Sequence, residues 1–343
     1  MLVEAAANVL QSNRHAPATV RTRSAQLRAY DQFVGELGIV AFPPTPEDVK
    51  LFAAWLMLNK CTRETSLRQY LSALKTHFAL LNLWVPAPRE YGPLAAVVEG
   101  SKRMFPGPIR RSLPVTVAIL RNLVFSRPPA AANARLRTVL QVLVDAMIIL
   151  FFSMLRSSSL FPPSASEADP ARNLVWERVR FSTNGAVISV VLAKTNQFCN
   201  RVHQVALAEK VGSPFCPVAA LRRLRALRPE AAGNEHVFQL PTSNGGWRLL
   251  VKTEVNVWFK SRIAEMGLDP EKYMLHGHRH GAVALALASE PNLALVKLQS
   301  DHLSDSIWTY AQVELSKRQS VAAVMLDAVD LFVPPRPAGH RHL

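Results

Sequence analysis

Apolar and polar side chains alternate with the spacing of helices through the first part of the chain. Over residues 19–37, apolar positions recur three or four residues apart and share one face, while arginines lie elsewhere. The proline-containing segment that follows predicts a loop, with Thr45 as an N-cap and Pro46 as the first residue of a helix that continues over 47–58. The pattern therefore predicts two helices joined by a short connection.

Two further helices are expected before the pattern changes. One begins near Thr62 or Thr65 and turns its leucines and aromatic residues inward, and a short one spans about 93–103. Residues 106–114 then combine prolines, a glycine and two arginines, which predicts an extended basic linker. Because Lys and Arg outnumber Asp and Glu by 40 to 25, a nucleic-acid partner is favoured, and we expect the linker to cross a phosphate backbone. The basic residues that we expect to contact DNA are Arg63, Arg68, Lys75, Lys102, Arg103, Arg110 and Arg111.

Beyond the linker, the pattern first remains helical and then becomes typical of strands. Three β-branched, partly alternating segments within 175–208 are separated by turn signals and predict a small antiparallel sheet. The expected helices are 116–126, 133–155, 217–228, 252–266 and further ones up to about 332. We therefore expect a mainly α protein with an N-terminal domain over 1–105, a linker over 106–114 and a mostly helical domain over 115–332. The proline-rich tail 333–343 has almost nothing to bury and is expected to be disordered.

The charge balance indicates a polyanionic partner. The chain has 343 residues, with 40 Lys and Arg against 25 Asp and Glu, and a formal net charge of +15 at pH 7. A surplus this large is typical of nucleic-acid-binding proteins, and a merely basic soluble protein is the alternative interpretation. The 49% of apolar residues indicates a globular chain, and its length suits two domains.

Cysteine usage and the N-terminal sequence favour an intracellular protein. Cys61, Cys199 and Cys216 are odd in number and lack C-x-x-C spacing, so neither a disulfide framework nor a zinc ribbon is indicated. The N-terminus lacks a basic segment leading into an apolar run, so no signal peptide is expected. The most apolar run, 139–155, is interrupted by polar residues and favours a core helix over a membrane span. We expect no membrane partner, and a location in the nucleus if the source is eukaryotic or otherwise in the cytoplasm.

Three separate clusters contain candidate catalytic residues. In FFSMLRSSSL, Arg156 follows a strongly apolar helix, where a charge ordinarily needs a partner. A plain helix-ending arginine, favourable with the helix dipole, is the alternative. In LHGHRHGAVALAL, His276 and Arg279 are three residues apart, so on a helix they project from one face and can converge on one phosphate.

The histidines of the second cluster also permit a metal interpretation. His276, His278 and His280 are close in sequence, and histidines at i and i+4 can share a zinc ion. No carboxylate or thiolate ligand lies nearby in the sequence, and Arg279 would place a positive charge beside the cation. A metal is therefore disfavoured, and ordinary surface or core histidines are the second alternative.

The third cluster, SDHLSDSIWTYAQV, contains His302 and Tyr310. Taken alone, it is typical of an amphipathic helix in which Trp308 and Tyr310 pack into a core. No phosphate-binding loop and no Rossmann glycine pattern occurs in the chain, so no ATP or dinucleotide cofactor is expected.

Together, the clusters resemble the tyrosine recombinase (phage integrase) family in order and separation. MLRSSSL is similar to the family's first-arginine segment, HGHRHGA to its H-x-x-R-H-G-A segment and DHLSDSIWTY to its His/Trp-to-Tyr segment, while LAKTNQF places Lys194 at the hairpin lysine. TVRTRSAQLRAYDQFV, TSLRQYLSALKTHF and GSKR resemble the four-helix, SAM-like core-binding domain of that family. The resemblance covers about residues 17–332. KTNQF, FCPVAAL and SDHLSDSIWTY are most similar to recombinases of eukaryotic mobile elements of the Crypton or DIRS kind.

The resemblance implies a DNA strand-exchange enzyme that acts in recombination, integration or transposition. The implied catalytic residues are Arg156, Lys194, His276, Arg279, His302 and Tyr310. Tyr310 would attack the phosphodiester and form a 3′-phosphotyrosyl link, whose conserved bond energy allows rejoining without ATP or metal. The two arginines would bind the phosphate oxygens, the histidines would donate to them or assist the tyrosine, and Lys194 would protonate the departing 5′ oxygen.

Three departures from the family pattern concern the site. Ser159 stands where a glutamate often supports the first arginine, so that support would be weaker or replaced. His278 stands where an apolar residue is usual, and the spacing from His302 to Tyr310 is one residue shorter than the usual nine. Tyr273, the other tyrosine nearby, has no matching sequence context.

Rival functions and partners complete the expectations. A type IB topoisomerase uses a similar residue set to relax supercoils, and a domesticated DNA-binding protein could have lost catalysis. The implied partners are double-stranded DNA and further copies of the chain, in a homodimer or homotetramer. Residues 314–332 predict a helix that docks on a neighbouring protomer, and packing on its own domain is an equal alternative.

Overall fold

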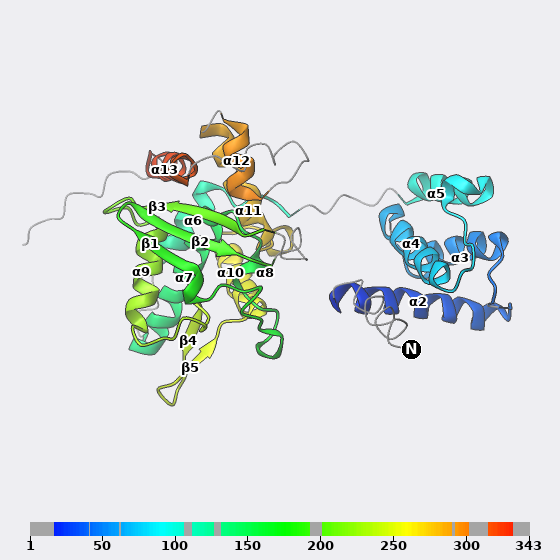
Figure 1. Ribbon diagram of the computed structural model, residues 1–343, viewed down its shortest axis with the longest axis horizontal. Helices are drawn as coiled ribbons and strands as arrows, with labels where there is room; N and C mark the ends of the chain where they lie inside the picture. Colours follow the sequence, from blue (N-terminus) through cyan, green and yellow to red (C-terminus); the bar gives the residue numbers. More distant parts are fainter. Residues whose placement is uncertain are drawn as a thin grey trace, which may run out of the picture. The chain divides into compact units, whose positions relative to one another are not determined.

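The computed structural model separates the chain into two units, Met1–Ile109 and Arg110–Leu343 (Figure 1). The structure describes residues 17–40, 42–61, 63–105, 112–126, 132–192, 201–289, 292–301 and 315–331. Most of the expected linker and the whole expected tail lie outside these ranges, so the expected domain limits stay predictions.

Four helices form the described part of the first unit, as the sequence pattern predicted. They are α2 (Pro17–Leu37), α3 (Pro46–Asn59), α4 (Glu64–Leu80) and α5 (Gly92–Met104). The Thr45 side chain caps α3 by accepting a hydrogen bond of 3.2 Å from the Asp48 backbone N–H, and Pro46 is the first helical residue. α4 begins at Glu64, between the predicted Thr62 and Thr65, and its N-cap residue Arg63 makes no side-chain cap bond.

Aromatic side chains make up much of the core of the first unit. Phe33 and Phe52 are fully buried, and Tyr30 packs edge-on against Phe52 with the ring centroids 5.1 Å apart. The apolar faces that the helical spacing predicted therefore meet in one cluster, which leaves the lysines and arginines at its surface.

The second unit is mostly helical around one small sheet. Its antiparallel strands are β1 (Val179–Ser182), β2 (Gly185–Val190) and β3 (His203–Ala208), in the spatial order β1-β2-β3. Its helices of eight or more residues are α6 (Val117–Val124), α7 (Ala134–Ser153), α9 (Pro217–Leu227), α10 (Lys252–Glu265), α11 (His276–Ser289), α12 (Leu293–Ser300) and α13 (Leu315–Leu331). The sequence pattern did not predict the second hairpin, β4 (Gln239–Pro241) with β5 (Trp247–Leu249), because three-residue strands leave almost no periodic signal.

Helix α7 forms the centre of the second unit. By length and composition alone it could span a membrane, but 67% of its most apolar stretch is buried inside the unit, as expected of a core helix. The buried carboxylate of Asp145 accepts a hydrogen bond of 3.2 Å from Arg223 Nε of α9, which offsets the cost of burying that charge. α7 ends at Ser153, and Met154 follows in the left-handed region with φ 53°.

The last described helix, α13, packs on its own unit. Val321 and Met325 are fully buried, and α13 contacts β3, α11 and α12 (Figure 1). Leu331, the last residue of α13, is 85% exposed. In the single chain, α13 thus packs on its own unit, which was one of the two alternatives. Its docking on a neighbouring protomer stays a prediction.

Two glycines of α11 allow the chain after the linker to lie directly against that helix. The Val115 backbone N–H donates to the Gly277 carbonyl at 2.9 Å. A Cβ atom on Gly281 would lie 1.8 Å from the Val115 carbonyl oxygen, and one on Gly277 would lie 2.4 Å from the Leu113 carbonyl oxygen. The glycines of HGHRHGA therefore fix how closely residues 113–115 approach the helix that begins with His276.

We predict that Gly281→Ala destabilises the second unit by about 1–3 kcal/mol, because its Cβ meets a backbone oxygen that cannot move without shifting residues 113–115. Urea unfolding followed by tryptophan fluorescence measures this change. Gly100→Ala is the matched control, since nothing lies within 4 Å of its added Cβ and it lies inside α5, where alanine is the better helix former. Equal stability of the Gly281→Ala variant and the unmodified protein would contradict the packing argument.

Candidate active site

Arg156 lies at the junction of two helices. α7 ends three residues earlier, and Arg156 is instead the N-cap residue of the short helix α8 (Ser157–Leu160), so the interpretation as a helix-ending arginine was wrong. Its side chain is 26% exposed, and its Nη1 lies 3.7 Å from Oδ2 of Asp301. The first arginine of the predicted set thus has an acidic partner and still reaches solvent.

Arg279 lies almost completely buried behind it. Its side chain comes from the first turn of α11, is 3% exposed, and donates from Nη1 to the Met154 carbonyl oxygen at 2.6 Å. Burial and, to a smaller extent, the charge of Arg156 lower the pKa of Arg279 to about 10, while Asp301 opposes both effects. The guanidinium group therefore stays protonated at neutral pH, and the carbonyl and the carboxylate help to hold it there.

His276 is the first residue of α11 and lies on the side of Arg279, as the spacing of three predicted. Its ring packs edge-on against that of His280, with the centroids 4.4 Å apart. Burial lowers the pKa of His276, and the positive charges of His280, Arg279, Arg156 and Lys252 add to that effect. Its ring is thus mostly neutral at pH 7 and can both donate and accept a hydrogen bond.

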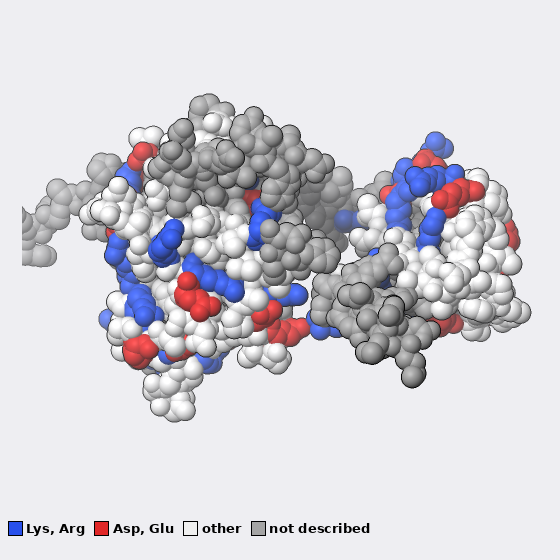
Figure 2. Space-filling view, in the orientation of Figure 1, with Lys and Arg blue, Asp and Glu red and all other residues white. Residues whose placement is uncertain are grey.

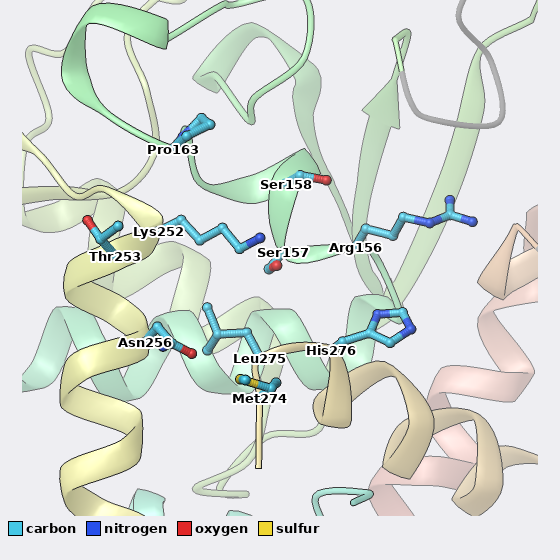
Figure 3. A pocket seen from close by; sticks show the side chains of 10 residues that line it. All are labelled: Arg156, Ser157, Ser158, Pro163, Lys252, Thr253, Asn256, Met274, Leu275 and His276. Carbon is cyan, nitrogen blue, oxygen red and sulfur yellow. The ribbon is translucent and has the colours of Figure 1, made fainter. Parts of the chain in front are cut away.

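Arg156 and His276 line an open pocket of about 620 Å³. Figure 3 shows the two side chains on the same side of this pocket, while Lys252 extends from the start of α10 toward Ser157. The pocket is also lined by Ser157, Ser158, Pro163, Thr253, Asn256, Met274 and Leu275. Its charged groups are positive, so it suits an anion such as a phosphodiester.

Sequence reasoning missed Asp301, which lies at this site. It ends α12 as the C-cap residue, in the left-handed region with φ 54°, and it is 5% exposed. Its Oδ1 accepts a hydrogen bond from Nη2 of Arg201, in addition to the contact of Oδ2 with Arg156. Its position beside His302 gave no usable signal, because its partners Arg156 and Arg201 are distant in the sequence.

His278 does not join its neighbouring histidines. Its side chain is fully buried, its ring packs against Phe259 with the centroids 4.8 Å apart, and its Nδ1 lies 3.3 Å from the Leu275 carbonyl oxygen. The three histidines therefore do not converge on one point, and within the described ranges no group of three His, Cys, Asp or Glu residues could hold a metal ion. His278 occupies a core position, as the family pattern of an apolar residue there suggests.

Three members of the predicted catalytic set, Lys194, His302 and Tyr310, lie outside the described residues. The sequence still relates them to the site. In the sequence, Lys194 belongs to the connection between β2 and β3, and Arg201 lies near the end of that connection. His302 directly follows Asp301. The structure thus brings together Arg156, Arg279 and His276, and the catalytic role of every predicted residue stays a prediction.

The predicted DNA contacts of the first unit lie on α4 and α5. Lys and Arg side chains gather with acidic ones over α5 and the adjacent part of α4 (Figure 2). Three are in ion pairs: Arg68 with Glu64, Lys75 with Glu90 at 2.7 Å and Lys102 with Glu99 at 2.9 Å. Arg103 is exposed and Arg63 is half-buried, while Arg110 and Arg111 lie outside the described residues. Exposed pairs of this kind contribute little to stability and can be exchanged for phosphate contacts at small cost.

Three solved structures with a similar fold are DNA recombinases or integrases. A lambda integrase dimer bound to a core site has a TM-score of 0.54 and 14% identity, over 92% of this chain and 93% of that one. The Tn1549 transposon integrase with transposon right-end DNA has a TM-score of 0.56 and 14% identity, over 92% and 96% of the two chains. XerH recombinase bound to a difH substrate has a TM-score of 0.54 and 12% identity, over 91% and 78%.

Sequence comparison gives no such link, because no protein-family model and no curated protein matches the chain. The structural matches nevertheless cover both units. The chain therefore has the fold of the tyrosine recombinases and integrases, with a helical core-binding domain followed by a mostly helical catalytic domain.

We predict that His278 makes the protein less stable as the pH falls. Burial lowers its pKa to about 3, whereas an unfolded histidine titrates near 6.5, so between these values the unfolded state binds a proton that the folded state does not. As the pH decreases below about 6.5, this residue should therefore lower the unfolding free energy by roughly 1.4 kcal/mol per pH unit. In His278→Leu this loss is absent, and its stability relative to the unmodified protein should rise by about 2 kcal/mol from pH 7 to pH 5. Urea unfolding at several pH values measures it, and a pH-independent difference would refute the prediction.

Proposed function

We propose that this protein is a site-specific DNA recombinase or integrase that cuts and rejoins strands through a 3′-phosphotyrosyl intermediate. The observation that carries the proposal is the convergence of Arg156, Arg279 and His276 beside one open, positively charged pocket. The fold supports it, since the solved structures with this fold are recombinases and integrases.

The chemistry proposed for these residues follows from their positions. Cleavage of a phosphodiester gathers negative charge on the phosphate oxygens that do not bridge to sugar. Arg156 faces the pocket and would donate to those oxygens directly, while Arg279, held by the Met154 carbonyl, would supply fixed positive charge from behind. The neutral ring of His276 would donate to the same oxygens or accept the proton of the attacking hydroxyl.

The residues outside the described ranges complete the proposed reaction. Tyr310 would be the nucleophile, Lys194 would protonate the departing 5′ oxygen, and His302 would share the histidine role. The phosphotyrosyl link would conserve the energy of the broken bond, so that attack by a free 5′ hydroxyl reverses it without ATP or metal.

The proposed biological setting extends beyond the fold. Both units would bind one DNA duplex, with the arginines of residues 106–114 contacting its backbone, and copies of the chain would assemble on two sites. The KTNQF, FCPVAAL and SDHLSDSIWTY segments favour a mobile-element enzyme of the Crypton or DIRS kind, which would act in the nucleus of its host.

Two DNA substrates test the proposal against its rivals. Incubation with DNA that carries two copies of a candidate terminal sequence should produce joined products whose formation depends on that sequence. Relaxation of a supercoiled plasmid without sequence-dependent joining would instead establish a type IB topoisomerase. Binding of DNA without cleavage of either substrate would establish a DNA-binding protein that has lost catalysis.

Tyr310→Phe is expected to abolish the covalent protein–DNA adduct on a nicked suicide substrate while DNA binding is unchanged, because phenylalanine lacks the attacking oxygen. Denaturing gel electrophoresis detects the adduct, and a gel-shift assay measures binding. The matched control is Tyr273→Phe, since Tyr273 packs against the core of the same unit and should form the adduct normally. An adduct that persists in Tyr310→Phe would place the nucleophile elsewhere.

Arg156→Ala and Arg279→Ala are each expected to lower the cleavage rate by roughly 10²-fold or more, because each removes positive charge that would stabilise the charged transition state. The rate of adduct formation on the suicide substrate measures the effect. Arg222→Ala, which removes a surface pair with Glu209 at 3.0 Å and a contact over the Phe181 ring at 5.1 Å, is the control and should cleave normally. Arg279→Ala should also lower stability because it leaves the Met154 carbonyl without its guanidinium donor, whereas a cleavage rate near normal in Arg156→Ala would contradict its role.

A further inference from the structure

The carboxylate of Asp301 joins segments that are far apart in the sequence. Its Oδ2 lies 3.7 Å from Arg156 Nη1, and its Oδ1 accepts a hydrogen bond from Arg201 Nη2. Arg156 lies directly after α7, Arg201 lies at the end of the connection from β2 to β3, and Asp301 itself ends α12. One buried acid thus connects three parts of the second unit.

Each of these parts contains a predicted catalytic residue or lies close to one in the sequence. Arg156 is itself in the predicted set, and Arg201 follows Lys194 by seven residues within the same connection. Asp301 immediately precedes His302, and Tyr310 follows in the same segment. In the sequence, Asp301 thus directly precedes the segment that carries the predicted histidine and the proposed nucleophile.

The electrostatic surroundings give the carboxylate a second effect. Arg156 lowers the pKa of the buried Arg279, and Asp301 acts in the opposite direction on that same group. Two nearby guanidinium groups repel each other strongly where water is scarce, so a negative charge between their segments stabilises the arrangement. The distance of 3.7 Å to Arg156 exceeds that of a direct hydrogen bond, so this contact is an electrostatic attraction and not a bidentate pair.

The backbone at Asp301 shows that this placement is maintained at some cost. A non-glycine residue at φ 54° is uncommon, although aspartate and asparagine tolerate the left-handed region better than most. The Asp301 N–H donates to the Lys297 carbonyl and ends α12 in this conformation. The sharp end of the helix directs the buried carboxylate toward the arginines.

We propose that Asp301 is a positioning residue, which holds Arg156 and Arg201 in place relative to the end of α12. It replaces from another part of the chain the acidic support that Ser159 cannot give to Arg156. This inference rests on the proposed strand-cleavage function, and Asp301 itself does not touch the DNA.

Asp301→Asn tests the proposal with the full-length protein, because asparagine keeps the size and the left-handed preference of aspartate and removes its charge. On a nicked suicide substrate, the single-turnover cleavage rate at saturating DNA should fall by about tenfold to a hundredfold, with the half-saturating DNA concentration unchanged. Arg201→Gln should lower the same rate, and the double variant should be no slower than the slower single variant, since both changes break one interaction. Asp327→Asn, which alters a surface pair with Lys210 at 2.7 Å, is the matched control and should cleave normally.

A second measurement separates this inference from the proposed function. Nitrogen-15 NMR of the arginine side chains should show that the guanidinium protons of Arg201, which donates to Asp301, exchange slowly with solvent in the unmodified protein and faster in Asp301→Asn. If the unmodified protein cleaves no DNA, the proposed function fails, and the exchange rate at Arg201 still decides whether Asp301 positions that arginine. Unchanged exchange at Arg201, or a normal cleavage rate in Asp301→Asn, overturns the proposal.

Discussion

The proximity of two arginine side chains, one of them nearly buried, is the constraint on which the site depends. Arg279 is 3% exposed and lies close enough to Arg156 for each charge to disfavour the other. Burying a guanidinium group costs several kcal/mol unless hydrogen bonds and opposite charge compensate for it. The Met154 carbonyl and the Asp301 carboxylate supply that compensation, the first at 2.6 Å from Arg279 and the second against Arg156.

The backbone around these arginines follows from the same requirement. Met154 leaves α7 in the left-handed region, which ends the most buried helix of the unit and leaves its carbonyl as an acceptor for Arg279. Gly277 and Gly281 let residues 113–115 lie against α11, the helix that carries Arg279 and His276. The helix is thereby held between the core and the chain that follows the linker. Such packing is what keeps charged donors in place before a substrate arrives.

The helices and the first sheet could be predicted from the sequence because their apolar spacing spans many residues. The ends of these elements were harder to predict. Thr45 was recognised as a cap, whereas α4 begins at Glu64 without a side-chain cap, so Arg63 gave no signal in the sequence. His276 and Arg279 were predictable as neighbours because three residues on a helix fix their relation. Asp301 could not be predicted, since its partners are distant in sequence and nothing local distinguishes a buried, paired acid from an exposed one.

The balance of charges also bears on how such a site would act on DNA. Within the described residues, Arg156 and Lys252 carry positive charge at the pocket and Arg279 adds another beside it, and the partners named above only partly offset their repulsion. A phosphodiester between Arg156 and His276 would remove repulsion that the folded protein otherwise has to sustain, and a transition state with more charge on its oxygens would remove more. In the proposed reaction, the repulsion between the positive groups would therefore be relieved in proportion to the negative charge that develops on the phosphate oxygens. Asp301 would offset only part of the positive charge of the arginines. A carboxylate that neutralised them completely would hold them in place and would also cancel the electrostatic field that the proposed reaction requires.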